Sequence, residues 1–295
     1  MPDQINISEL KALLNLLDEP DDRVYDTIHH KIMDYGMRAV PFLEEYQYTT
    51  TNRTSITRAE NLIRNIQNRL HFIKLNDWAR HRSHDLLEAY CLISSLYQEE
   101  DSCKANRISV NKLYRDIWLE MNDDLTALEK IRVINHLFFE IYRYSGHQSE
   151  HASLPAYLLG NLLRMQLGNS LSLSLLYLIV TQKLGLPIYG VNLPHHFILA
   201  YMDDTIPTRK AEEYTQNEVL FYINPFDKGA LFRKTEIELF LKQRNIRPNK
   251  HFYLPCNNIT VIRRLLNELL ILHQENHQKN REETIKQLLE AVKQK

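Results

Sequence analysis

Apolar residues recur at helical spacing through the first half of this 295-residue chain, and this periodicity constrains the fold more than any other feature. Leu10, Leu13, Leu14 and Leu17 stand at positions i, i+3, i+4 and i+7, which places them on one face of a helix. The same spacing continues over residues 24–36, 41–46, 56–70, 86–93, 110–121 and 125–144. The chain has only seven Gly, which disfavours tight β-meanders and glycine-rich phosphate loops. We therefore expect a mostly helical protein.

Charge and cysteine content narrow the classes of function. The chain has 36 Lys and Arg against 37 Asp and Glu, so no general positive field attracts nucleic acid or an anionic membrane. No apolar run reaches the roughly 18 residues of a membrane span, and the N-terminus lacks the features of a signal peptide. Cys91, Cys103 and Cys256 form neither a CxxC pair nor a zinc-binding spacing. These features predict a cytoplasmic protein without a cofactor and without a nucleic-acid or membrane partner.

Histidine pairs give little support for a metal site. His147 and His151 are four residues apart, and His81 and His84 are three residues apart, so each pair can share one helix face. Neither pair has a third ligand at a predictable spacing. We therefore expect no bound metal.

The helical pattern also suggests how the chain is divided. Short helices in residues 1–80 are joined by acidic or proline turns such as 19–22, and they loosely resemble helical hairpins of the HEAT type. A plain helical cap is the alternative. Residues 81–250 are expected to form the core together with a helical lead-in, and residues 251–295 a C-terminal pair of helices.

The pattern changes after residue 145. Residues 171–180 are apolar on nearly every face, which indicates a helix that is buried on most sides. Three short segments then read as strands: 188–193, 196–201 and 220–223. The turn at 224–229 follows the last of these strands. The sequence therefore predicts an α+β protein, with a small antiparallel sheet packed on the buried helix.

Three polar residues stand at the ends of these elements. Ser170 comes directly before the buried helix, His196 begins a strand, and Asn224 ends the next strand. A helix N-terminus lowers the pKa of a nucleophile and stabilises an oxyanion. A His can then act as the base while an Asn orients it. The order nucleophile, His, Asx is that of papain-like sites.

Several motifs in residues 158–229 appear in the order found in one known family. They are Gly168, Asn169, Ser172, Leu173, Ser174, Leu175–Leu178, Gly185–Pro187, Gly190–Val191, His196–Phe197 and Pro225–Phe226. The segment resembles the transglutaminase-like superfamily, and within it the bacterial SirB-type branch. This resemblance implies a bacterial protein with a papain-like core.

The departures from the family pattern bear on activity. Catalytic members of the superfamily have Cys where this chain has Ser170, and Asp where it has Asn224, whereas the His is kept as His196. The Gly before that His is replaced by His195, and the final Gly-Gly pair reads Lys228-Gly229. A serine hydroxyl is far less ionised than a thiol, so the mechanism of a cysteine enzyme does not carry over unaided.

The resemblance and these departures lead to three hypotheses about function. The first is a catalytically degenerate transglutaminase-like protein that binds a peptide or a partner protein. The second is a hydrolase or acyltransferase that uses Ser170, His196 and Asn224 as a triad. The third is a helical-repeat scaffold in which the α/β core only stabilises the repeats.

Structural roles compete with these assignments. Ser170 also fits the N-cap of the helix that follows it, and Ser172 and Ser174 fit small packing positions on that helix. His196 lies in an apolar strand, where a hydrogen-bonded core histidine is common. Asn224 precedes a proline and therefore also suits a turn.

Residues that could line a binding cleft follow from the same segment. We expect Asn169, Tyr177, His195 and Tyr201 near such a cleft, although core packing is an alternative for the two tyrosines. Cys256 is the one cysteine to consider as a displaced nucleophile, because it follows an apolar run.

Overall fold

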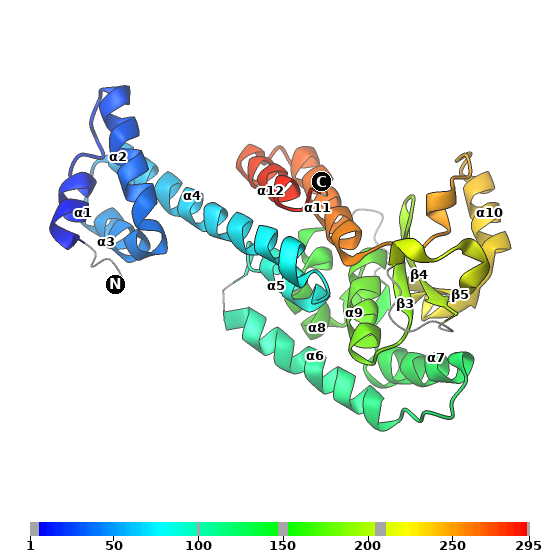
Figure 1. Ribbon diagram of the computed structural model, residues 1–295. Helices are drawn as coiled ribbons and strands as arrows, with labels where there is room; N and C mark the ends of the chain where they lie inside the picture. The colour runs from blue at the N-terminus through cyan, green and yellow to red at the C-terminus, as the bar shows by residue number, and fades with distance from the viewer. Residues whose placement is uncertain (1–5, 99–100, 147–152, 204–210, 294–295) are drawn as a thin grey trace. The chain divides into compact units, whose positions relative to one another are not determined.

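The computed structural model describes residues 6–98, 101–146, 153–203 and 211–293. The chain divides into two compact units, residues 1–74 and residues 75–295 (Figure 1). The boundary falls in the last turn of helix α4 (Arg53–Asp77). Every residue of the candidate site lies in the larger unit.

The smaller unit is helical. It contains α1 (Ile7–Leu14), α2 (Asp22–Tyr35), the 3-10 turn η1 (Gly36–Ala39), α3 (Val40–Thr49) and most of α4. The acidic turn after α1 starts the next helix, because the Asp21 carboxylate accepts the free main-chain N–H groups of Arg23 and Val24. Leu10, Leu17 and apolar residues of the other helices form one core. The proposed HEAT-type repeat stays a prediction.

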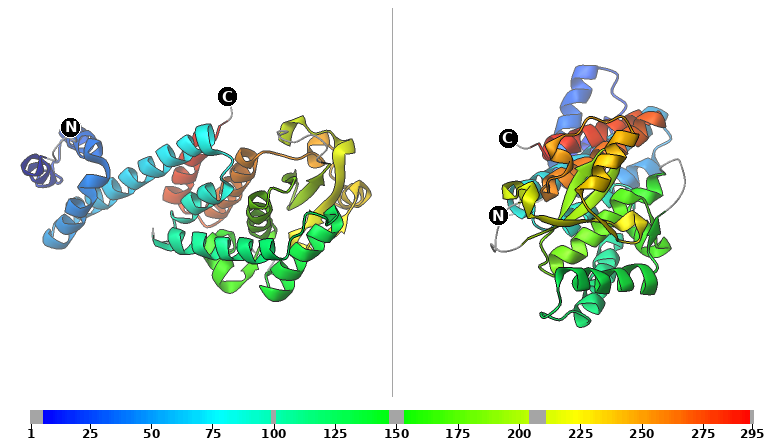
Figure 2. Two further views of the ribbon diagram at one scale, coloured as in Figure 1. Left: turned by 60° about the horizontal axis from the view of Figure 1, so that its bottom comes forward. Right: turned by 90° about the vertical axis from the view of Figure 1, so that its right-hand side faces the viewer.

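The larger unit surrounds one buried helix with other helices and a sheet. Its helices are α5 (Leu86–Ser94), α6 (Asp101–Leu119), α7 (Ala127–Asn135), α8 (Leu159–Met165), α9 (Ser170–Lys183), α10 (Lys234–Gln243), α11 (Asn258–Glu275) and α12 (Lys279–Ala291). Helix α9 lies between the sheet and helices α6 and α8 (Figures 1 and 2). Its residues from Leu171 to Thr181 are all buried, which explains why its sequence is apolar on nearly every face.

The sheet has four antiparallel strands in sequence order. They are β3 (Ile188–Leu193), β4 (His196–Met202), β5 (Val219–Asn224) and β6 (Ala230–Phe232). The pair Leu193 and His196 closes the hairpin between β3 and β4. This turn fixes His196 as the first residue of β4, and Asn224 is the last residue of the neighbouring β5. The prediction of an α+β protein with a helical N-terminal region and a small antiparallel sheet is confirmed.

Parts of this unit differ from the predicted elements. Two short strands that the sequence analysis did not predict are β1 (Ser145–Gly146) and β2 (Leu167–Gly168), which pair in parallel. Strands of two residues show no alternation, so periodicity misses them. The helix expected over 125–144 is α7 followed by a π-helical segment, His136–Ile141. Strand β6 was also missed, because it has only three residues.

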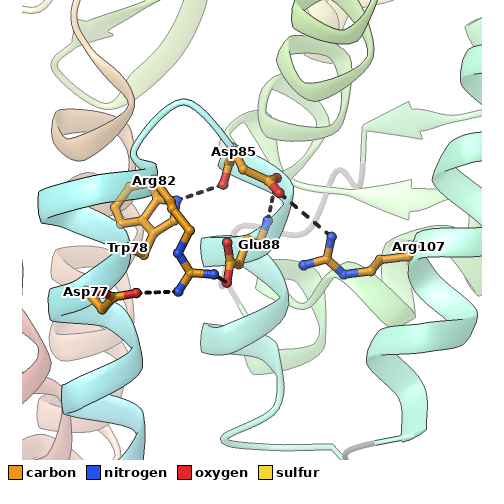
Figure 3. A network of polar contacts seen from close by, with 6 residues as sticks. All are labelled: Asp77, Trp78, Arg82, Asp85, Glu88 and Arg107. Carbon is orange, nitrogen blue, oxygen red and sulfur yellow. Dashed lines mark hydrogen bonds and ion pairs between the residues drawn. The ribbon is translucent and has the colours of Figure 1, made fainter.

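A polar network holds the end of α4 against α5 (Figure 3). The Trp78 indole N–H donates to the main-chain oxygen of Asp85 at 2.8 Å, and the Asp85 side chain caps α5 by accepting the N–H of Glu88. The Arg82 guanidinium bridges Asp77 and Glu88. These bonds set the start of α5 relative to the last turn of α4. Among the described residues, no helix is long and apolar enough to cross a membrane.

Candidate functional site

The site begins at the N-terminus of α9. The Asn169 side chain accepts the main-chain N–H of Ser172 at 2.8 Å, and the Ser172 hydroxyl accepts the N–H of Asn169 at 3.0 Å. This reciprocal capping makes Asn169 the N-cap and Ser170 the first helical residue. The alternative that Ser170 is the N-cap is therefore wrong. A Cβ at Gly168 would lie 2.6 Å from the Ser172 hydroxyl, so the close approach requires glycine there.

Two serines attach α9 to strand β4. The Ser170 hydroxyl oxygen accepts the main-chain N–H of Phe197 at 3.2 Å. One turn later, the Ser174 hydroxyl donates to the Phe197 carbonyl oxygen at 3.1 Å. The peptide groups of Phe197 are thus held by α9, next in sequence to His196. Within the part of the chain that the structure describes, no hydrogen bond joins the Ser170 hydroxyl to the His196 ring.

His196 and Asn224 come together across neighbouring strands. The His196 Nε2 atom lies 3.2 Å from the Asn224 Oδ1 atom. The same Oδ1 atom accepts the main-chain N–H of Phe226 at 3.2 Å, so Asn224 also caps the following turn. Because an amide oxygen only accepts hydrogen bonds, Nε2 carries the proton and Nδ1 keeps its lone pair when the ring is neutral. Asn224 therefore has both the turn position and the contact with histidine that its sequence context suggested.

Aromatic rings surround the His196 imidazole. The Phe226 ring meets it edge to face, with centroids 5.8 Å apart, and the Phe240 ring lies 6.3 Å away. Burial lowers the pKa of His196 below its ordinary value of 6.5; the nearby Arg244 lowers it too, whereas the hydrogen bond to Asn224 and the charge of Asp227 oppose the shift.

The lowered pKa has consequences at neutral and acidic pH. The His196 imidazole is neutral at pH 7, so its Nδ1 atom is an acceptor or a base. Its burial as a neutral ring contributes stability above the unfolded-state pKa of 6.5. That contribution is lost as the pH falls from 6.5 through the lower pKa of the folded protein.

Of the other residues predicted to line a cleft, the two tyrosines lie in the core and His195 lies at the surface. Tyr177 is fully buried and its hydroxyl donates to the Asn135 side chain at 3.0 Å, so its ring belongs to the core. Tyr201 is also buried, against Phe221. His195 is exposed in the turn before β4 and has a positive φ of 60°. Neither tyrosine therefore offers a surface to a ligand, whereas the ring of His195 is open to solvent.

Phe226 and Phe240 are site residues that sequence reasoning did not single out. Phe226 belongs to a recognised motif, and the aromatic residue after Asn224-Pro225 is the signal that could have identified it. Phe240 lies on α10, about forty residues beyond the histidine in sequence, and no local pattern connects the two.

The histidine pairs and Cys256 are the other residues that the sequence singled out. Within residues 6–98, 101–146, 153–203 and 211–293, no three His, Cys, Asp or Glu side chains form a group that could hold a metal ion. His147 and His151 lie outside the described residues. Cys256 lies beside β3, where its main-chain N–H donates to the Gly190 oxygen at 2.8 Å.

The family is decided by comparison with known proteins. The sequence model of the transglutaminase-like superfamily matches residues 105–267, which is more than half of the chain. The chain belongs to the transglutaminase-like superfamily. The matched segment contains α9 and all four strands of the sheet, and with them Ser170, His196 and Asn224.

Relatives of this superfamily member occur in animals and bacteria. The mouse F-box only protein 21 is 28% identical over 140 residues, which are 47% of this chain and 21% of that protein. A UPF0162 protein of Buchnera aphidicola is 28% identical over 182 residues, 60% of this chain and 57% of the relative. A UPF0162 protein of Xylella fastidiosa is 32% identical over 78 residues, 26% of this chain and 28% of the relative. The chain thus matches between about a fifth and just over half of these proteins' lengths. No solved structure matches it.

Proposed function

We propose that this protein is a catalytically degenerate member of the transglutaminase-like superfamily, and that it binds a peptide or a segment of a partner protein at Ser170, His196 and Asn224. The observation that supports this most strongly is the state of the Ser170 hydroxyl. Its oxygen accepts from the Phe197 main chain, and the described chain has no hydrogen bond from it to a base. A serine needs such a base to become a nucleophile, because its hydroxyl is scarcely ionised at neutral pH.

The surroundings of the site suit a peptide. The neutral His196 ring has one free acceptor, and the Phe226 and Phe240 rings provide apolar surface beside it. Peptides present main-chain N–H donors together with apolar side chains, so these two features are complementary to them. We extend the proposal to a bacterial protein of the SirB-type branch that acts in the cytoplasm.

A second candidate function is hydrolysis or acyl transfer by a Ser-His-Asn triad. It is favoured by the contact between His196 and Asn224, since an asparagine oxygen on Nε2 leaves Nδ1 as the base. Catalytic hydrogen bonds are often long before substrate binds, so the missing contact to Ser170 does not exclude this candidate.

A matched pair of variants on α10 tests the binding proposal. Peptides selected from a displayed random library on the full-length chain are expected to lose about tenfold in affinity on Phe240→Ala, about 1.4 kcal/mol, because Phe240 lies against His196. Leu239→Ala should change affinity less than twofold, since Leu239 is the exposed neighbour on the same helix. Titration calorimetry measures both. If every selected peptide binds Phe240→Ala as tightly as the wild type, the site is not the binding surface.

A further inference from the structure

A second surface of the larger unit lies at the C-terminal end of α6. The side chains of Trp118 and Leu119 are 56% and 66% exposed there, whereas Trp78, the other tryptophan of the chain, is fully buried. Helix α6 runs along the outside of this unit and leads into the loop before α7 (Figures 1 and 2). Tryptophan is enriched at the centres of protein interfaces, and an exposed pair of this size is a feature to explain.

These two residues border a groove with a volume of about 530 Å³. Its lining consists of Trp118, Leu119, Met121, Asn122, Asp123, Lys130, Leu184 and Leu186. The apolar members come from the end of α6, the loop that follows it, and the turn after α9. The polar members come from the loop after α6 and from α7. A groove lined by five apolar and three polar residues can hold an apolar side chain and a polar group of the same ligand.

The loop after α6 places acidic side chains beside this groove. Asp123 and the basic Lys130 are its charged lining residues, and Glu120 and Asp124 adjoin the lining residues in sequence. Among the described residues, Glu120, Asp123 and Asp124 form no ion pair, so their charges are not neutralised within the protein. Unpaired acidic groups beside an apolar surface favour a cationic partner, both by attraction and by steering its approach.

We propose that this groove, the α6 groove, is a docking site for a segment of a partner protein that carries a large apolar side chain flanked by Lys or Arg. The apolar side chain enters between Trp118 and Leu186, and the basic residues face Glu120, Asp123 and Asp124. The α6 groove is built from residues other than those of the Ser170 site, so this inference does not depend on the proposed function.

Accessibility of Trp118 is the first test of the α6 groove. In full-length protein carrying Trp78→Phe, Trp118 is the one remaining tryptophan, and we expect acrylamide to quench it as it quenches an exposed tryptophan. If acrylamide does not quench the fluorescence of Trp118, the proposal is overturned, because the α6 groove is then already covered. A concentration-dependent dimer in analytical ultracentrifugation that disappears on Trp118→Ala would also overturn it, by making a second copy the occupant.

Peptide selection is the second test. Peptides from a displayed random library are selected on the full-length chain and counter-selected on Trp118→Ala, and we expect them to combine an aromatic or aliphatic residue with Lys or Arg. Their affinity should fall at least tenfold on Trp118→Ala and on the double variant Glu120→Lys, Asp123→Lys. It should not change on Ile108→Ala, an exposed residue elsewhere on α6, or on Phe240→Ala.

The outcomes of the selection are distinguishable. Acidic peptides, peptides indifferent to the charge reversal, or no peptide that discriminates against Trp118→Ala would each contradict the proposal. Circular dichroism of every variant confirms that the fold is retained. If the peptides lose affinity on Phe240→Ala but keep it on Trp118→Ala, they bind at the Ser170 site. That result would overturn the assignment of those peptides to the α6 groove.

Discussion

Gly229→Ala is expected to destabilise the larger unit by about 2–5 kcal/mol, although it adds only one methyl group. Gly229 has a φ of 72°, where an alanine costs about 1–2 kcal/mol. An added Cβ would also overlap with the Asn135 amide group. The nitrogen of that amide donates a hydrogen bond to the Gly229 oxygen at 3.0 Å. Moving Asn135 away breaks that bond and leaves the buried Tyr177 hydroxyl without its acceptor, at a cost of roughly 1–3 kcal/mol.

Gly185→Ala is the matched control for this variant. Gly185 has nearly the same φ, 71°, but nothing lies within 4 Å of an added Cβ. We expect it to lose only the conformational part, about 1–2 kcal/mol. Urea unfolding followed by tryptophan fluorescence measures both, since Trp78 and Trp118 lie in the larger unit. Equal losses for the two variants would mean that Asn135 does not tie the turn at Gly229 to α9.

Ser170→Cys is expected to create a thiol that alkylates about five- to tenfold faster at pH 7 than an ordinary exposed cysteine. An ordinary cysteine, with a pKa near 8.5, is only about 3% thiolate at that pH. At residue 170 the N-terminus of α9 and the main-chain N–H of Phe197 both stabilise a negative charge. A pKa lowered by about one unit raises the thiolate fraction by this factor.

Ser109→Cys supplies the reference for this reaction. Ser109 is exposed in the middle of α6, far from either end of that helix, so its thiol experiences no helix terminus. Iodoacetamide labelling followed by peptide mass mapping gives the rate at each position separately from the natural cysteines. Of these, Cys91 is buried and its thiol pKa is raised by burial. If the thiol at residue 170 reacts no faster than the thiol at residue 109, the helix terminus does not activate this position.

Much of the fold follows from residue patterns. The apolar run 171–180 predicted a buried helix because a helix covered on all sides needs no polar face, and α9 has that position. Runs of alternating or apolar residues between glycine and proline turns predicted β3, β4 and β5, to within one residue at each end. The short elements β1, β2 and β6 depend on pairing with distant residues, so local sequence does not reveal them.

The site was predictable in its residues more than in its geometry. The motif order pointed to His196 and Asn224, and the structure places their side chains 3.2 Å apart. The hydrogen bond from the Phe197 N–H to Ser170 could not be anticipated, because it depends on the packing of α9 against β4. Tyr177 was expected near a cleft, yet it lies in the core, because the π-helical segment after α7 brings Phe138 and Phe139 against its ring.

Intact mass after exposure to a fluorophosphonate tests the central claim most directly. The reagent adds covalently to serines that a neighbouring base activates, and a known serine hydrolase in the same reaction serves as the positive control. We predict no adduct on the full-length wild-type protein under conditions that label the control completely, because Ser170 hydrogen-bonds to the main chain and not to His196. An adduct that maps to Ser170 and disappears in Ser170→Ala would contradict the account and establish the Ser-His-Asn triad as catalytic.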